Sequence, residues 1–168
     1  MKSRFLLLLL LVALAIGLLY FLTLDFNLKN LATVVSSTII DLTNKYRAEN
    51  RTFPLVANPL LEQAAKLKAE DMAQRGYFSH LTPEGKDLTH FLNQAGYNYK
   101  YAGENLAVNF FDSTEVTDAW VKSFSHRDNL VKNKYIEIGV ASAEGIFQGR
   151  QSIFVVQYFG TPVTSNWI

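Results

Sequence analysis

The sequence predicts an α+β domain that follows an apolar segment long enough to cross a membrane. Three observations carry this prediction: a charge-free apolar run near the N-terminus, helical patterns through the middle, and two β-rich runs near the end. Helices around a small antiparallel sheet define the α+β class. With 168 residues, the chain is long enough for one domain with its own core.

The apolar run covers residues 5–24 and contains no charged side chain. About 20 apolar residues are enough to span a bilayer as a helix. Two basic residues lie before the run, so residues 1–4 are expected in the cytoplasm and the rest of the chain outside the cell. Residues 25–34 are expected to link this segment to the domain. These features predict a single-pass protein of the cell membrane.

The same run could instead be a signal peptide, which would leave a secreted protein. Signal peptides have shorter apolar regions, of roughly 7–15 residues, and small residues at the cleavage site. The small-x-small pattern of this segment, Ala13-Leu14-Ala15, lies inside the apolar run. Cleavage there would leave apolar residues at the new N-terminus, which favours a retained anchor.

Composition argues against several classes of protein. The 16 basic and 15 acidic residues nearly balance, so the charge gives no indication of a nucleic-acid partner. The chain contains no cysteine, which excludes a disulfide framework, a thiolate nucleophile and a cysteine zinc site.

Two helices are predicted at the start of the domain. Apolar residues three or four apart mark the first over Thr33–Glu49. A loop with two prolines follows at residues 51–59. Asn58 then caps the second helix, which has Pro59 in its first turn and ends at Gly76. Its apolar face is expected to contain Leu60, Leu61, Ala64 and Leu67.

Two further helices are predicted later in the chain. Asp87 caps a short helix that ends at Gly96. Asp112 and Glu115 form a capping-box pattern at the start of the next helix. One face of that helix is expected to carry Val116, Ala119, Trp120, Ser123 and Phe124.

Two strands complete the predicted domain. The runs at residues 136–141 and 151–160 are rich in β-forming residues and are expected to pair antiparallel, joined around Glu144–Gly149. The domain is therefore expected to cover residues 35–162, with a tail at residues 163–168.

Glu104 is an unusual charged residue, because it lies among small, aromatic and aliphatic neighbours in YAGENLAVNFF, residues 101–111. An ionised carboxylate in such surroundings needs a partner. The neighbouring Gly103 is expected to supply a backbone bend. The sequence contains no HExxH, GxSxG, P-loop or GxGxxG motif that would name the chemistry of Glu104.

The three histidines differ in their surroundings. His90 lies off the apolar face of its helix and is expected to be solvated at the surface. His80, in a loop, is equally suited to a structural hydrogen bond and to a functional role. His126 follows Ser123 by three residues and borders the buried face of its helix, so it is expected to have a partner.

Five stretches between residues 39 and 160 carry a family resemblance: TNKYRAEN, LVANPLLEQAAKLKAEDMAQRGYFSHLTPEG, LNQAGYNYKYAGENLA, AWVKSFSHRDNLVKNKYIEIGVA and FVVQYFG. Together they resemble the CAP superfamily of cysteine-rich secretory proteins, antigen 5 and pathogenesis-related 1 proteins, in its bacterial SCP-domain form. The resemblance implies an α-β-α sandwich with a central cleft.

The family's cleft carries two histidines and two glutamates. His80 matches the first histidine, Glu104 matches the glutamate of the GEN motif, and His126 matches the second histidine. The second glutamate falls on Ser123, so this chain departs from the full set. The resemblance implies that Glu104 faces one or both imidazoles and accepts charge-assisted hydrogen bonds from them.

The resemblance also implies a weak divalent metal site. His80 and His126 would hold zinc or another transition metal, with Glu104 as a candidate third ligand. Because Ser123 replaces a glutamate, the site has one negative charge fewer, and a tightly held metal is not expected.

Three functions follow from these residues. The favoured one is a membrane-tethered extracytoplasmic module that binds a lipid, a peptide or a cell-envelope component. Most of the aromatic residues that flank the GEN motif are expected in the core or the sheet, and one or two exposed rings among them would offer a stacking surface: Tyr97, Tyr99, Tyr101, Phe110 and Phe111. The first alternative is a metal-assisted hydrolase with Glu104 as general base. The second is a structural domain in which the site residues hold loops together. The family has no established common activity, so the sequence leaves open whether the chain is an enzyme.

Overall fold

The computed structural model describes residues 12–17 and 36–163. The chain divides into two compact units, Met1–Val34 and Val35–Ile168. In the first unit, residues 12–17 are helical and exposed. The rest of the predicted anchor and the predicted linker lie outside the described residues. Among the residues that are described, no helix is both long and apolar enough to cross a membrane.

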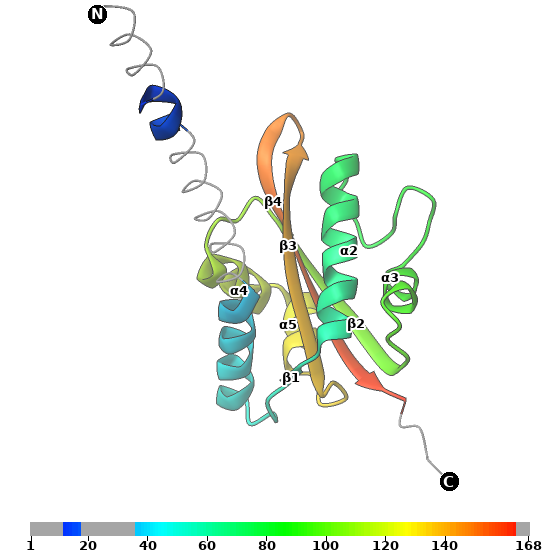
Figure 1. Cartoon of the computed structure of the whole chain (residues 1–168). Coiled ribbons are helices and arrows are strands. Elements are labelled where there is room, and N and C mark those ends of the chain that lie inside the picture. Colours follow the sequence, from blue (N-terminus) through cyan, green and yellow to red (C-terminus); the bar gives the residue numbers. More distant parts are fainter. Residues whose placement is uncertain (1–11, 18–35, 164–168) are drawn as a thin grey trace, which may run out of the picture. The chain divides into compact units, whose positions relative to one another are not determined.

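The second unit is built on a four-stranded sheet with the order β1-β3-β4-β2 (Figure 1). β4 (Arg150–Pro162) pairs antiparallel with both β3 (Glu137–Phe147) and β2 (Tyr99–Val108). β1 (Val56–Ala57) pairs parallel with β3. The predicted β3–β4 hairpin is thus confirmed, whereas β1 lies in the segment that was predicted to be a loop. The sheet is therefore mixed, and β2 forms one of its edges.

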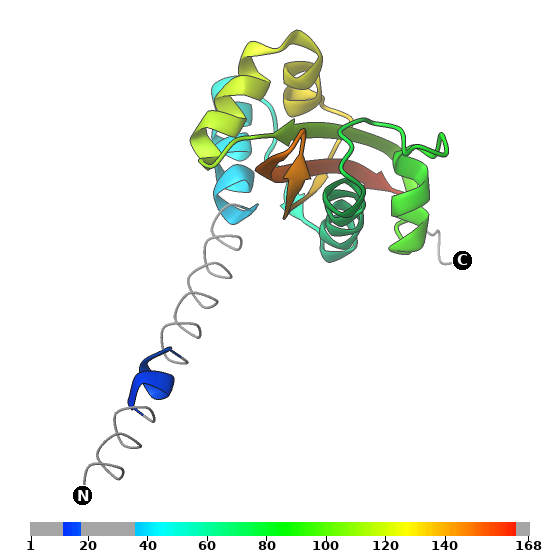
Figure 2. The ribbon, with the colours of Figure 1, turned by 90° about the horizontal axis from the view of Figure 1, so that it is seen from above.

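Helices cover both faces of this sheet (Figure 2). α2 (Pro59–Arg75) and α3 (Leu88–Gln94) lie on one face. A helical segment at residues 36–49, together with α4 (Ser113–Lys122) and α5 (Phe124–Val131), lies on the other. This three-layer arrangement is the α-β-α sandwich that the family resemblance implied.

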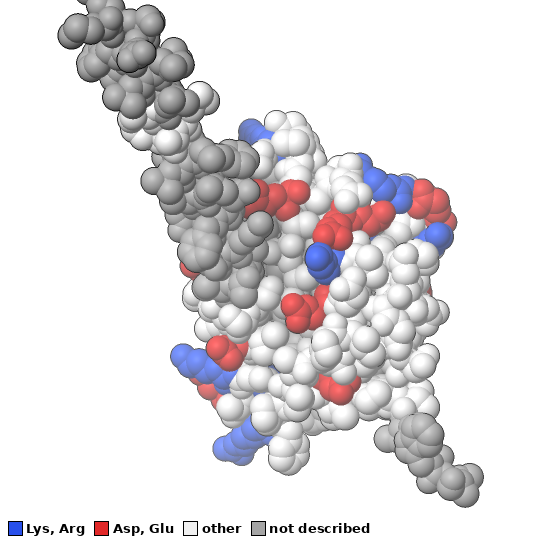
Figure 3. Space-filling view, viewed as in Figure 1, with Lys and Arg blue, Asp and Glu red and all other residues white. Residues whose placement is uncertain are grey.

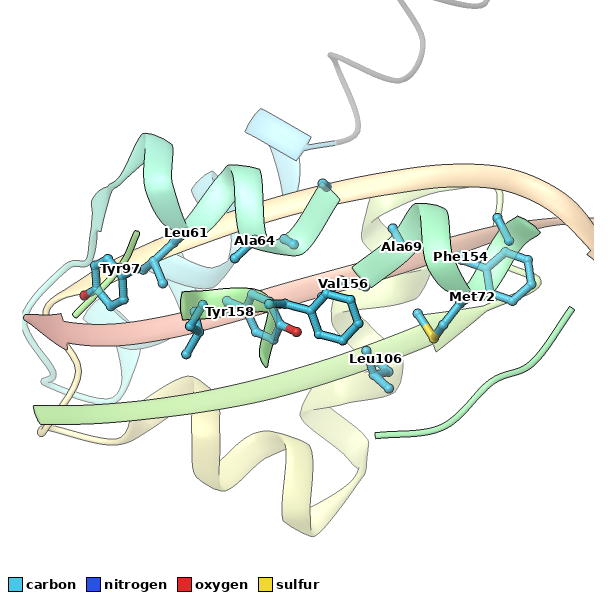
Figure 4. Packing of buried hydrophobic residues seen from close by; sticks show 14 residues of the cluster. Leu61, Ala64, Ala69, Met72, Tyr97, Leu106, Phe154, Val156 and Tyr158 are labelled. Carbon is cyan, nitrogen blue, oxygen red and sulfur yellow. The ribbon is translucent and has the colours of Figure 1, made fainter. Parts of the chain in front are cut away.

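The larger apolar cluster fills the space between α2 and the sheet, where Tyr97, Leu106, Phe154, Val156 and Tyr158 meet the helix (Figure 4). The buried face of α2 consists of Leu61, Ala64, Ala65, Lys68, Ala69, Met72 and Ala73. The prediction for this face was wrong in part, because Leu60 is exposed and Leu67 is half-buried. The face also includes a lysine, which the apolar pattern did not reveal.

Glycine allows α2 to approach the sheet closely. A Cβ atom on Gly139 of β3 would lie 2.2 Å from the backbone of α2. Asn58 accepts hydrogen bonds from the first two backbone N–H groups of α2 that follow Pro59, and Gly76 ends the helix in the left-handed conformation with φ 67°. Both predicted ends of this helix are confirmed.

On the face of the sheet opposite α2, the prediction of a single helix through Phe124 is wrong. The sequence pattern predicted one helix through Phe124, but the chain leaves the helical conformation at Ser123, where ψ is 125°. α5 then begins at Phe124 in a new direction, so the Phe124 side chain is 78% exposed instead of buried. The cap at Asp112 is confirmed, since its carboxylate accepts from the N–H groups of Thr114 and Glu115.

Basic and acidic side chains alternate on the face shown in Figure 3, with uncharged surface between them. This distribution agrees with the near balance of charge in the sequence. No large field of one sign is visible on this face, so its surface charge does not select a strongly charged partner.

Candidate functional site

The candidate residues meet along the edge strand β2, between α2 and α5. Three carbonyl groups on this strand accept hydrogen bonds from side chains of the α4–α5 layer and the loop that follows it. The donors are Tyr135, Asn129 and Trp120, which lie 3.2, 3.1 and 3.0 Å from the carbonyl oxygens of Ala102, Glu104 and Leu106. These contacts hold β2 in place and cover its carbonyl groups.

Gly103 is required here for a different reason from the predicted bend. Its φ is not positive, and a Cβ atom at this position would lie 2.3 Å from the hydroxyl oxygen of Tyr135. The glycine therefore makes room for the tyrosine that secures β2.

His80 and Glu104 form a close pair. His80 Nδ1 donates to Glu104 Oε1 at 2.5 Å. The glutamate side chain is 3% exposed, whereas the histidine side chain is 62% exposed. The hydrogen bond to Glu104 raises the pKa of His80, and burial opposes that rise only in part. The buried carboxylate of Glu104 thus orients the His80 ring through Nδ1, and Nε2 takes no part in this hydrogen bond.

Two buried groups lie behind Glu104. Tyr158 on β4 is its cross-strand neighbour and is fully buried. Burial and then the charge of Glu104 raise the pKa of Tyr158, so its hydroxyl stays protonated. Glu104 Oε2 and the Tyr158 hydroxyl are both buried and have no hydrogen-bond partner among the described residues. Lys68 on α2 is the second group, and attraction to Glu104 partly offsets the burial that lowers its pKa.

His126 has a different partner. Its Nδ1 lies 2.9 Å from Ser123 Oγ, at the break between α4 and α5. Burial and then the nearby charge of His80 lower the pKa of His126. The structure therefore pairs Glu104 with one imidazole, His80, and leaves the other neutral beside a hydroxyl. His90 is not in this site; its ring packs edge-on against Phe91.

The donor set does not fit a resident catalytic metal. Glu104 Oε1 is already used by His80, and the carboxylate is buried behind that residue. One ring nitrogen on each of His80 and His126 remains, whereas catalytic zinc normally has three protein ligands. Over residues 12–17 and 36–163, no group of three or more His, Asp and Glu side chains is arranged to hold a metal ion. This geometry supports Glu104 as the partner of His80 and not as a third ligand or a base on metal-bound water.

A pocket of about 240 Å³ adjoins His126. Ser123 and His126 supply its polar side chains, and the remaining lining residues are apolar: Phe78, Leu106, Ala107, Val108, Phe110, Ala119 and Trp120. Phe78 lies two residues before His80, so the same loop contributes both a wall of the pocket and the histidine of the ion pair. The cleft thus combines an apolar cavity with an ionic group.

The aromatic residues that flank the GEN motif differ in exposure. Phe110 lines the pocket, the neighbouring Phe111 is 65% exposed, and Tyr99 and Tyr101 are half-buried. Tyr97 is buried and donates to Glu137 at 2.6 Å, which makes it part of the core.

Sequence reasoning missed two parts of the site. Lys68 was detectable, because Ala64, Lys68 and Met72 are four residues apart and share the buried face of α2. The side chains of Asn105 and Asn129 were not, because the hydrogen bond of 3.0 Å between them depends on the packing of α5 against β2.

Comparison with known proteins agrees with this geometry. The model of the cysteine-rich secretory protein family, CAP, matches residues 40–159. The chain belongs to the CAP family. It is 32% identical over 122 residues to YkwD of Bacillus subtilis, covering 73% of this chain and 46% of YkwD. It is 30% identical to the membrane protein YlbC of the same organism, over 69% of this chain and 34% of YlbC.

Solved structures extend the likeness of this CAP domain. An extracellular SCP-domain protein from Bacillus anthracis superimposes with a TM-score of 0.68 at 27% identity, covering 77% of this chain and 41% of that one. An outer surface protein of Borrelia burgdorferi shares the fold, with a TM-score of 0.65 at 21% identity and coverage of 76% and 92%. The chain is thus a bacterial SCP-domain protein, and it spans less than half the length of the Bacillus relatives.

Proposed function

We propose that this CAP protein is a membrane-tethered extracytoplasmic binding module whose pocket beside His126 receives an apolar group of its ligand. The observation that carries the proposal is the apolar pocket of about 240 Å³ that lies against one of the family's two cleft histidines. The apolar run at residues 5–24, an extracellular relative and a relative named as a membrane protein support the location.

The pocket limits what can bind. Sites for whole drug-sized ligands usually measure about 300–1,000 Å³. A smaller pocket suits one ring or one branched side chain of a larger ligand, such as a peptide, a lipid or an envelope fragment. Apolar walls favour such a group by removing its surface from water. His126, with its lowered pKa, adds a neutral polar contact at the edge.

The first test is a fluorine NMR titration of the full chain in lipid nanodiscs with 4-fluorobenzyl alcohol. We expect saturable broadening of the probe signal by the wild type. Ala119→Trp fills the pocket from α4 and should abolish it. Ala48→Trp is the matched control, because Ala48 is exposed on the helix at residues 36–49 and does not line the pocket. Equal binding by Ala119→Trp, or no binding by the wild type, would contradict the proposal.

The ion pair favours hydrolysis as a second candidate function. A buried carboxylate that orients an exposed imidazole through Nδ1 is the arrangement of a general base, with Nε2 left to accept a proton. In this version the neutral form of His80, present above its raised pKa, activates water, and Glu104 orients His80. The test is hydrolysis of p-nitrophenyl esters, peptides and glycans by wild type and His80→Gln, with and without zinc. Activity that His80→Gln abolishes would support this function, and an inactive wild type would exclude it for those substrates.

A further inference from the structure

Lys68 is a fully buried lysine whose contacts converge on the loop that carries His80. Its Nζ atom lies 3.3 Å from the hydroxyl of Tyr77 and 3.3 Å from the carbonyl oxygen of His80. The ammonium also lies 5.1 and 5.2 Å from the centres of the Tyr77 and Phe91 rings. A charge without access to water is costly unless it is paired, so these contacts need a reason.

The two hydrogen bonds of Lys68 hold both ends of a short segment. Tyr77 is its first residue and His80 its last, and Phe78 between them is a wall of the pocket. The Tyr77 hydroxyl also donates to Asp71, one turn further along α2. The segment at residues 77–80 is therefore fastened to α2 from inside, at both its first and its last residue.

A second buried cation shows what a structural role looks like. Within the described part of the chain, Arg47 donates to carbonyl oxygens only, with the shortest contacts to Phe53 and Leu130, both at 2.7 Å. Lys68 has a buried carboxylate, Glu104, as its strongest source of attraction. Because Glu104 is the partner of His80, Lys68 acts on both members of the pair: it donates to the carbonyl group of His80 and is attracted to the charge of Glu104.

We propose that Lys68 is a positioning residue that fixes the segment at residues 77–80 and so sets where His80 and the Phe78 wall stand in the cleft. This inference deepens the proposed function and rests on it where ligand affinity is concerned. Lys68 does not touch the pocket itself. Lys68 acts through the segment at residues 77–80, so the His80–Glu104 pair and the Phe78 wall of the pocket both depend on this one buried group.

The test compares two lysine residues of α2. Lys68→Met removes the buried ammonium and keeps the unbranched side chain. Lys66→Met is the matched control, because it removes an exposed ion pair with Glu70 on the same helix and no contact with residues 77–80. The readout is the pKa of His80 from NMR titration of the full chain in lipid nanodiscs. Loss of one exposed ion pair should leave the pKa of His80 unchanged.

The direction of the change separates the two explanations for Lys68→Met. If Lys68 positions the loop, the contact with Glu104 loosens and the pKa of His80 falls toward its ordinary value of 6.5. If Lys68 is only a nearby like charge, its removal raises the pKa of His80, because that charge lowers it in the wild type. A rise, or no change, would overturn the proposal. Tyr77→Phe, which removes one of the two hydrogen bonds, should lower the pKa in the same direction by less.

The 4-fluorobenzyl alcohol titration then tests the consequence for binding. Lys68→Met should bind the probe about five-fold more weakly, because the Phe78 wall must be ordered on binding. Unchanged affinity and an unchanged His80 pKa would overturn the inference and leave the proposed function standing. Failure of the wild type to bind the probe would overturn the proposed function, and the pKa comparison would still decide the role of Lys68.

Discussion

The two histidines of the cleft are held in opposite ways. His80 is exposed, but its Nδ1 donates to a buried carboxylate. His126 is half-buried and pairs with a hydroxyl. The first arrangement raises the pKa of His80 and the second, through burial, lowers the pKa of His126. Glu104 thus favours the charged form of His80, whereas burial favours the neutral form of His126.

This contrast makes the two imidazoles unequal as metal ligands. A metal on Nε2 of His80 would leave the Nδ1–H bonded to Glu104 and would compete only with the Nε2 proton, whose loss the raised pKa of His80 makes harder than for His126. The sequence suggested two equivalent ligands, whereas in the structure deprotonation for metal binding is harder for His80 than for His126. The organic ligand that we propose would contact both parts of the cleft, the ionic edge and the apolar pocket.

The largest expected effect comes from removing the ionic half of the contrast. Glu104→Ala should destabilise the fold by about 3 kcal/mol, because Lys68 would stay buried with Asp71 as its remaining source of attraction. Chemical denaturation of the purified chain measures this change. Glu144→Ala is the matched control, an exposed glutamate on β3 that should change stability by less than about 0.5 kcal/mol. A loss as small as that of the control would mean that Lys68 does not depend on Glu104.

Removing the neutral contacts on the His126 side should destabilise the fold by less. Asn105, the next residue, lies on the opposite face of β2 and donates to Gln157 at 3.1 Å and to the carbonyl group of His126 at 3.2 Å. Asn105→Ala should cost about 1–3 kcal/mol, the usual penalty for leaving buried neutral groups without partners. The same denaturation assay applies, with the exposed Asn133→Ala as control. A larger loss than for Glu104→Ala would reverse the comparison.

The smallest effect is the pH dependence of stability. The His80–Glu104 pair contributes fully below about pH 6.5, and its contribution is lost as pH rises through the raised pKa of His80. His126 acts in the opposite sense, because its lowered pKa costs stability as pH falls below 6.5. In melting experiments, His80→Gln should remove the loss above pH 6.5, and His90→Gln should keep it. A wild-type slope in His80→Gln would show that the pair does not stabilise the fold.

Much of this arrangement followed from local sequence signals. Glu104 was identified as buried and paired because its neighbours are apolar, and the pair with His80 agrees with that prediction. The ends of α2 followed from Asn58 and Gly76, since capping is a local property. The fold class followed from the helical and β-rich runs.

The remainder depends on tertiary packing. β2 was not predicted as a strand, because Gly103, Glu104 and Asn105 are unfavourable there by propensity. Its burial and its pairing with β4 override that preference. The break at Ser123 has no glycine or proline to signal it. It moves Phe124 into solvent and brings the Ser123 hydroxyl to His126.

The most direct test of this account is an NMR titration of the two imidazoles in the wild-type full chain, with His80→Gln and His126→Gln to assign the signals. We predict that His80 titrates above 6.5, with its proton on Nδ1 in the neutral form, and that His126 titrates below 6.5. If both titrate near 6.5, or if their order is reversed, Glu104 does not hold His80 and the division of the cleft into an ionic and a neutral side is wrong.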